Sequence, residues 1–102
     1  MKISILAAAC GLALVTAQAG AQTAGPTDPQ IAAIVVTANQ VDIDAGKLAQ
    51  RKSHTKDVKA FAKLMVVDHT GVNKAATALV TKLKVTPEPN ATSASLAKGG
   101  VD

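Results

Sequence analysis

The sequence is nearly without aromatic residues and cysteine, since its 102 residues contain one Phe, one Cys, no Trp and no Tyr. A single Cys excludes an intramolecular disulfide framework and a cysteine-based zinc site. One aromatic ring is too few for the stacking platforms that bind single-stranded nucleic acids, so we expect no nucleic-acid partner. Charged residues make up 18% and hydrophobic residues 48%, which is typical of one small folded domain and not of a disordered tail.

Sequence motifs of catalysis are also absent. The chain has no Gly-x-Ser-x-Gly, no Gly-rich phosphate loop and no His-Glu-x-x-His. His54 lies in an expected turn with only Asp57 as a nearby acid, which favours a solvated side chain over a general base. We therefore expect a protein that is not an enzyme, and we assign no catalytic residue, no cofactor-binding residue and no cofactor.

Residues 1–21 have the features of a signal peptide. Lys2 supplies a positive charge, residues 3–15 form an apolar run, and small residues follow at the spacing of a cleavage site. We expect the mature chain to begin at Gln22, with Gly20 as the alternative first residue. Because the apolar run is too short for a spanning helix, we predict export to the periplasm or cell envelope and no transmembrane anchor after cleavage.

Apolar periodicity in the rest of the chain predicts two long helices. Asp28 is predicted to cap the first helix, with Pro29 at its first helical position, and apolar residues then recur at helical spacing to about Lys52. A short turn follows, Thr55 can cap the second helix, and this helix stops before Pro87. Since a short connection makes neighbouring helices antiparallel, we expect a helical hairpin.

The predicted fold class is all-α: an antiparallel two-helix hairpin and the start of a third helix. Residues 22–27 are rich in Ala, Gly, Thr and Pro and read as a linker, and residues 28–102 as a partial helical-bundle domain. Residues 91–102 begin like a helix and then run into two glycines. The sequon at Asn90 is expected to be inert, because the signal peptide looks bacterial.

The second helix carries apolar residues on two opposite faces. The first face comprises Val58, Phe61, Ala62, Met65, Val66, Val72, Ala76, Leu79, Val80 and Leu83, and the opposite strip comprises Ala60, Leu64, Val67, Gly71, Ala75 and Ala78. One partner helix does not cover two faces. We therefore expect self-association or association with another helical protein, the alternative being that Leu64 and Val67 are simply exposed.

Asp42 and His69 are polar residues in the middle of these apolar stripes. They lie at heights that differ by only about 3 Å when counted from the turn, so we expect them to face each other. Three roles are open: a buried hydrogen-bonded pair that fixes helix register, half of a metal site, or a pH-sensitive helix contact. Two ligands fall short of the usual three or four, so we assign no metal site and keep Asp42 and His69 as the candidate ligands.

Several segments together resemble the family called domain of unknown function 4142. The resemblance spans roughly residues 29–98 and is carried by residues 42–49, 58–62, 65–70 with Asn73, and 83–87. It implies an exported bacterial protein with a ferritin-like four-helix bundle, in some members named as an outer-membrane protein, and it implies no particular reaction.

The resemblance also implies two further long helices with additional His residues after Pro87, whereas this sequence ends at Asp102. This difference favours a truncated chain, in which a metal site built from four helices would be incomplete. The expected function is therefore that of an exported envelope protein that acts by helix–helix association. A stress-related role is one function that such a protein could have. The alternatives are a ferritin-like metal-binding protein and an inactive fragment of a longer one.

Overall fold

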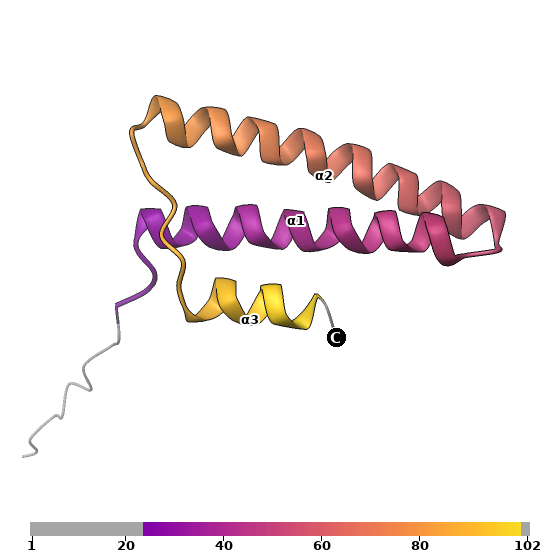
Figure 1. Cartoon of the computed structure of the whole chain (residues 1–102). Coiled ribbons are helices and arrows are strands. Elements are labelled where there is room, and N and C mark those ends of the chain that lie inside the picture. The colour runs from indigo at the N-terminus through magenta and orange to yellow at the C-terminus, as the bar shows by residue number, and fades with distance from the viewer. Residues whose placement is uncertain (1–23, 101–102) are drawn as a thin grey trace, which may run out of the picture.

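The computed structural model describes residues 24–100, which form three helices and no strands (Figure 1). Helix α1 spans Asp28–Lys52, α2 spans Lys56–Lys82 and α3 spans Ala91–Gly99. The predicted all-α class, with a two-helix hairpin followed by a short third helix, is confirmed. The predicted signal peptide lies outside the described residues.

Helix α1 begins one residue earlier than expected. Thr27 is the N-cap, and its side chain accepts a hydrogen bond from the Gln30 amide at 3.4 Å. The Gln30 side chain accepts in return from the Thr27 amide at 3.0 Å, which completes a capping box. The prediction that Asp28 caps α1 was therefore wrong: Asp28 lies in the first turn, where its charge favours the positive end of the helix dipole.

A turn of three residues joins α1 to α2. Ser53 caps the end of α1 and its hydroxyl accepts from the Thr55 amide at 3.1 Å. Thr55 occupies the N-cap position of α2, as predicted, but its side chain makes no capping hydrogen bond. The short turn forces α2 to run back along α1.

Small residues let α1 and α2 approach closely. A Cβ atom on Gly46 would lie 2.8 Å from Cγ2 of Val66 and 3.0 Å from the carbonyl oxygen of Ala62. Gly46 and Ala62 are both buried at this contact. The backbone of α2 therefore occupies the space that a larger residue at position 46 would need.

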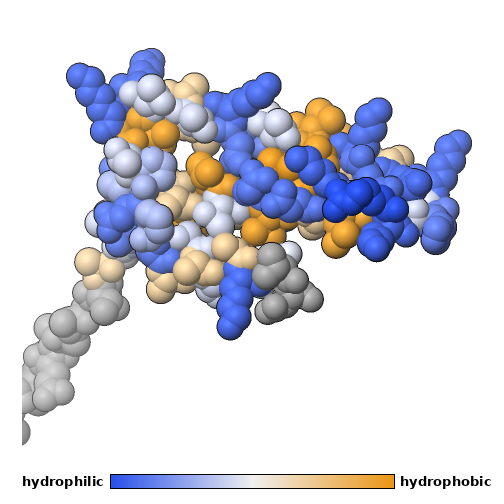
Figure 2. Space-filling view, in the orientation of Figure 1, coloured by the Kyte–Doolittle hydropathy of each residue, from blue (hydrophilic) through white to orange (hydrophobic). Residues whose placement is uncertain are grey.

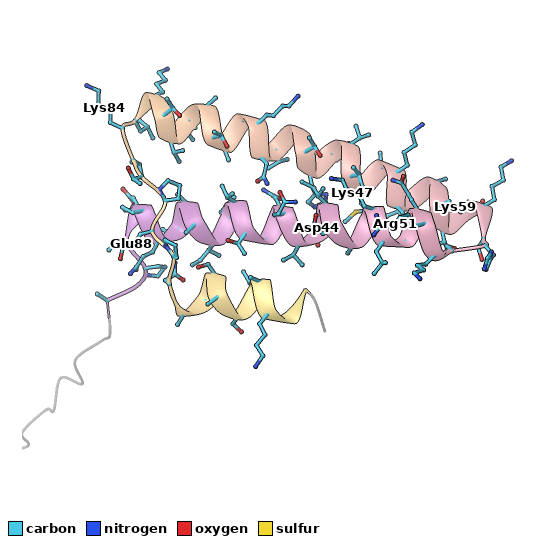
Figure 3. All side chains as sticks on the ribbon, in the orientation of Figure 1. Asp44, Lys47, Arg51, Lys59, Lys84 and Glu88 are labelled. Atoms are coloured by element: carbon cyan, nitrogen blue, oxygen red, sulfur yellow. The ribbon has the colours of Figure 1, made fainter. Side chains whose placement is uncertain are left out.

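A left-handed residue follows the end of helix α2. Lys84 has φ of 55°, and the Val85 amide bonds back to the Val80 carbonyl at 2.9 Å, in the pattern of a Schellman cap. The chain then crosses the start of α1, where the Glu88 amide donates to the Pro29 carbonyl at 2.9 Å. Figure 3 labels Lys84 and Glu88 at the two ends of this crossing.

Helix α3 lies along α1 on the side away from α2 (Figure 1). Asn90 caps it, since its side-chain oxygen accepts from the amides of Thr92 and Ser93, each at 3.1 Å. The Asn90 side-chain amide also donates to the Gln30 carbonyl at 3.2 Å, which ties the start of α3 to the start of α1. Within residues 24–100, α3 contacts α1 and not α2. The three helices thus form an open layer with α1 in the middle.

This open layer buries little apolar surface. Among the described residues, the buried apolar side chains are those of Ala33, Ile43 and Ala62, while ten large hydrophobic side chains are exposed. Figure 2 shows apolar patches over the two long helices with hydrophilic side chains around them. The hairpin therefore presents to solvent the kind of side chain that forms a core in a closed bundle.

Candidate functional site

One face of the hairpin exposes apolar side chains along both long helices, and we call it the open face. Its residues recur every three or four positions and so remain on one side of each helix. They are Ile31, Val35, Asp42, Ala45 and Ala49 of α1 with Val58, Phe61, Met65, His69, Val72, Ala76, Leu79 and Leu83 of α2. Seven large apolar side chains of the open face are between 41% and 63% exposed, with Phe61 the most exposed.

Two apolar hollows lie in the open face, one toward each end of the hairpin. The larger, about 330 Å³, lies between the start of α1 and the end of α2 and is lined by residues that include Ile31, Val35, Leu79 and Leu83. The smaller, about 210 Å³, lies nearer the turn and its lining includes Phe61. Hollows of this kind between helices accept side chains of a third or fourth helix.

Asp42, which also lines the smaller hollow, contacts His69, as the sequence predicted. Nε2 of His69 is 3.2 Å from Oδ2 of Asp42, and Nδ1 of His69 is 2.8 Å from the carbonyl oxygen of Met65. The expectation that this pair is buried was wrong. The side chains are 24% and 46% exposed for His69 and Asp42, because no third helix covers the open face within the described residues.

The chemistry of the pair follows from its two acceptors. Met65 offers a carbonyl oxygen and Asp42 a carboxylate oxygen, so the His69 ring donates to both only as the doubly protonated imidazolium. A neutral ring that donates from Nδ1 directs its Nε2 lone pair at the carboxylate. The two side chains can therefore share a proton or offer two ligand atoms to one cation.

Metal ligands are few in the part of the chain that the structure describes. Residues 24–100 contain no group of three or more His, Cys, Asp or Glu side chains arranged to hold a metal ion. Asp68 and His54 are exposed, and the ion pair between Asp42 and His69 is the one found in these residues. Asp42 and His69 remain the candidate ligands, and together they offer two ligand side chains.

Two asparagines on the facing sides of the long helices were not assigned a role by sequence reasoning. The Asn73 side chain donates to the Val36 carbonyl at 3.3 Å, a cross-helix hydrogen bond. Nδ2 of Asn39 and Oδ1 of Asn73 are buried without a hydrogen-bond partner among the described residues. Polar residues at helix-facing positions were the sequence signal for this contact, but the pairing depends on the helix register.

Both apolar faces of α2 have uncovered residues. Helix α1 covers only part of the first face, at residues such as Ala62 and Val66, so most large residues of that face are exposed. On the opposite strip, Leu64 is 53% and Val67 is 59% exposed, which confirms that α1 leaves this strip without cover.

No described helix combines the length and the hydrophobicity needed to cross a bilayer.

Comparison with known proteins assigns the chain to a family. The model of the family described as "Domain of unknown function (DUF4142)" matches residues 13–99, which is most of the chain. Neither a curated protein nor a solved structure matches it. The matched range contains all three helices, the open face and the pair of Asp42 and His69. The chain therefore belongs to the DUF4142 family.

Proposed function

We propose that this DUF4142 protein is a non-enzymatic helical-bundle protein that acts by binding another helical surface through its open face. The observation that supports the proposal is the exposure of seven large apolar side chains on one side of the hairpin. Fully burying one such side chain contributes about 1.5–3 kcal/mol, so covering this face is strongly favourable. Contiguous apolar patches of this extent are typical of protein interaction sites.

Site-directed cross-linking tests the proposal. In a Cys10→Ser background, Phe61→Cys places a single thiol on the open face, and Lys74→Cys places a matched thiol on α2 beside Thr70 and Thr77. Each variant is labelled with a maleimide photo-cross-linker in cells that express the chain. We expect cross-linked products from position 61 and few from position 74. Equal yields from the two positions would contradict the proposal.

We also propose that the chain is exported and acts in the bacterial periplasm or envelope. The support is the order of Lys2, an apolar run over residues 3–15 and small residues up to position 21. When all 102 residues are expressed, mass spectrometry of the periplasmic fraction should find a chain that begins at Gln22. An Ala21→Leu variant should lose this cleavage. An intact Met1 in the cytoplasmic fraction would contradict export.

A second candidate function is metal binding, and one observation favours it. The Met65 carbonyl accepts from Nδ1 of His69, an arrangement that commonly orients a metal-binding imidazole, and Nε2 lies 3.2 Å from the Asp42 carboxylate. Metal analysis of the purified chain tests this candidate. Stoichiometric metal that is lost in His69→Ala and retained in Asp68→Leu would support it, and a metal content equal to a buffer blank would overturn it.

A further inference from the structure

We propose that the end of the hairpin that contains the turn, residues 47–64, docks on a bilayer surface that carries anionic lipids. We call these residues the turn end. Its basic side chains would bind lipid phosphates, and its exposed apolar side chains would enter the boundary between the headgroups and the hydrocarbon. The proposal adds a second binding surface to the one on the open face, and so goes beyond the proposed function.

Positive charge is concentrated at the turn end. Its residues include six Lys and Arg side chains and one acid, Asp57, which gives a net charge of +5 with His54 neutral. The other described residues, 24–46 and 65–100, contain four Lys side chains and five acidic ones, a net charge of −1. The chain therefore has one strongly basic end. The six cations of the turn end are Lys47, Arg51, Lys52, Lys56, Lys59 and Lys63.

The hairpin gathers these six cations into one cluster. Three residues join the end of α1 to the start of α2, so the whole turn end lies within about 15 Å of the turn. All six side chains are exposed, and none takes part in an ion pair within the described part of the chain. Figure 3 shows Lys47, Arg51 and Lys59 toward the turn and Lys84 at the other end. A cluster of cations without acidic partners attracts a surface of opposite charge.

Large apolar side chains are exposed among these cations. They are Leu48, Val58, Phe61 and Leu64, and Phe61 is the only aromatic residue of the chain. Val58 and Phe61 belong to the open face, whereas Leu64 belongs to the opposite strip of α2 and Leu48 to neither. A helical partner on the open face would therefore leave Leu48 and Leu64 in water.

A bilayer surface offers a contact to both kinds of side chain at the turn end. Lipid phosphates lie outside the hydrocarbon, and long Lys side chains extend to them while neighbouring apolar side chains enter more deeply. Free phosphate or an acidic protein surface would bind the cations and leave the apolar side chains among them exposed. Lys and Arg together with Phe and Leu are typical of segments that lie in the bilayer interface.

Flotation with lipid vesicles tests the charge of the surface. The chain is purified in the form that accumulates in cells and mixed, at low salt, with vesicles of equal parts phosphatidylglycerol and phosphatidylcholine. We expect the chain to float with these vesicles and not with vesicles of phosphatidylcholine alone. High salt should release it, because salt screens the attraction. Equal binding to both kinds of vesicle, or to neither, would overturn the proposal.

A triple variant tests the position of the surface on the chain. Lys56→Gln, Lys59→Gln and Lys63→Gln together remove half of the cations of the turn end and retain a good helix former at each position. Since each Lys near an anionic lipid surface contributes to binding, we expect this variant to bind the mixed vesicles about 100-fold more weakly.

The matched control removes the same charge from the rest of α2 and the residue after its cap. It combines Lys74→Gln, Lys82→Gln and Lys84→Gln, all at exposed positions outside the turn end. We expect it to bind less than about threefold more weakly, because these positions lie beyond the screening length. Both triple variants leave the open face unchanged, so their outcome is independent of the proposed function. Equal losses in the two variants would show that net charge alone causes binding, and would overturn docking by the turn end.

Tryptophan fluorescence tests the entry of the apolar side chains. The chain has no Trp, so Phe61→Trp and Leu83→Trp each introduce a single fluorophore. The two positions are similarly exposed, at 63% and 60%, but Leu83 lies at the other end of the hairpin. With the mixed vesicles we expect a blue shift of the emission at position 61 and none at position 83. Equal shifts at both positions, or no shift at position 61, would overturn docking by the turn end.

Discussion

At the scale of single residues, Gly46 and Gly71 show how the same residue type has opposite effects in the two long helices. A Cβ on Gly46 would press on the Ala62 carbonyl oxygen at 3.0 Å, whereas a Cβ on Gly71 would have no atom within 4 Å. In an exposed helix, replacing Gly by Ala stabilises by about 1 kcal/mol, because Ala has less backbone freedom to lose. At position 46 this gain is opposed by a clash with the backbone of α2.

We therefore expect Gly71→Ala to stabilise the chain by about 1 kcal/mol and Gly46→Ala to destabilise it by about the same amount. Urea unfolding followed by circular dichroism measures both. If Gly46→Ala stabilised the chain as much as Gly71→Ala does, the close contact between α1 and α2 would be refuted.

Asp42 and His69 differ in what their removal leaves behind. His69→Ala leaves a gap beside Met65 and an unpaired carboxylate, whereas Asp42→Leu fills its space with an apolar side chain. Since the Asp42 side chain is 46% exposed, water screens the ion pair and the unpaired charge costs little. We expect His69→Ala to cost about 1 kcal/mol and Asp42→Leu less. Urea melts at low chain concentration, with Asp68→Leu as a control, check the order, and the reverse order would contradict the facing pair.

At the scale of elements, the caps decide where each helix begins. Thr27 and Asn90 each complete a capping box, whereas Thr55 occupies an N-cap position without a side-chain hydrogen bond. Asn90 does more than cap, because its amide also reaches the Gln30 carbonyl at 3.2 Å. The nine-residue α3 is too short to be stable alone, so it depends on this cap and on its contact with α1.

Asn90→Ala is therefore expected to release α3 from α1. Loss of the cap alone costs about 1 kcal/mol, and the tether to Gln30 is lost with it. Hydrogen–deuterium exchange should show faster exchange of the α3 amides and little change in α2, which α3 does not contact. Asn90→Asp retains the capping oxygen without the amide donor. Its α3 amides should exchange at a rate between those of the unmodified chain and of Asn90→Ala. Unchanged exchange in α3 would show that Asn90 does not hold it.

At the scale of the whole molecule, the balance of buried and exposed apolar residues is the main feature. Ala33, Ile43 and Ala62 are the buried apolar side chains in the described residues, while ten large apolar side chains are exposed. A chain of this size buries a smaller fraction of its surface than a larger domain does, even when it folds completely. Self-association through the open face, which we expect, would add to the stability of the fold, because a partner that binds only the folded state stabilises it.

The melting temperature should therefore rise with chain concentration. If two chains associate in the folded state, we expect the melting temperature to rise by about 3–6 °C for each tenfold increase in chain concentration. Phe61→Lys, on the open face, should remove this dependence, and Leu64→Lys, at a site of similar exposure on the opposite strip, should retain it. Differential scanning calorimetry over two decades of concentration measures the effect. A melting temperature independent of concentration would contradict self-association through the open face.

The sequence by itself determined the elements and the pairing of Asp42 with His69. Helical periodicity and the proline near position 87 are local signals, so both long helices and the later short helix were predicted, with α1 ending at Lys52 as expected. The facing pair followed from counting residues outward from a tight turn, because the rise per residue is fixed. The cap of α1 was misplaced by one residue, since Asp28 and Thr27 are both good caps and the Gln30 side chain decides between them.

The exposure of the pair was decided by tertiary structure alone. Periodicity shows which residues share a face, but not whether another helix covers that face. The hydrogen bonds from the connection to Pro29 and Gln30 direct α3 along the side of α1 away from α2, so the open face stays uncovered in the described residues. Asp42 and His69 therefore lie partly exposed on the open face, because the path of the chain after α2 depends on contacts between residues some sixty positions apart.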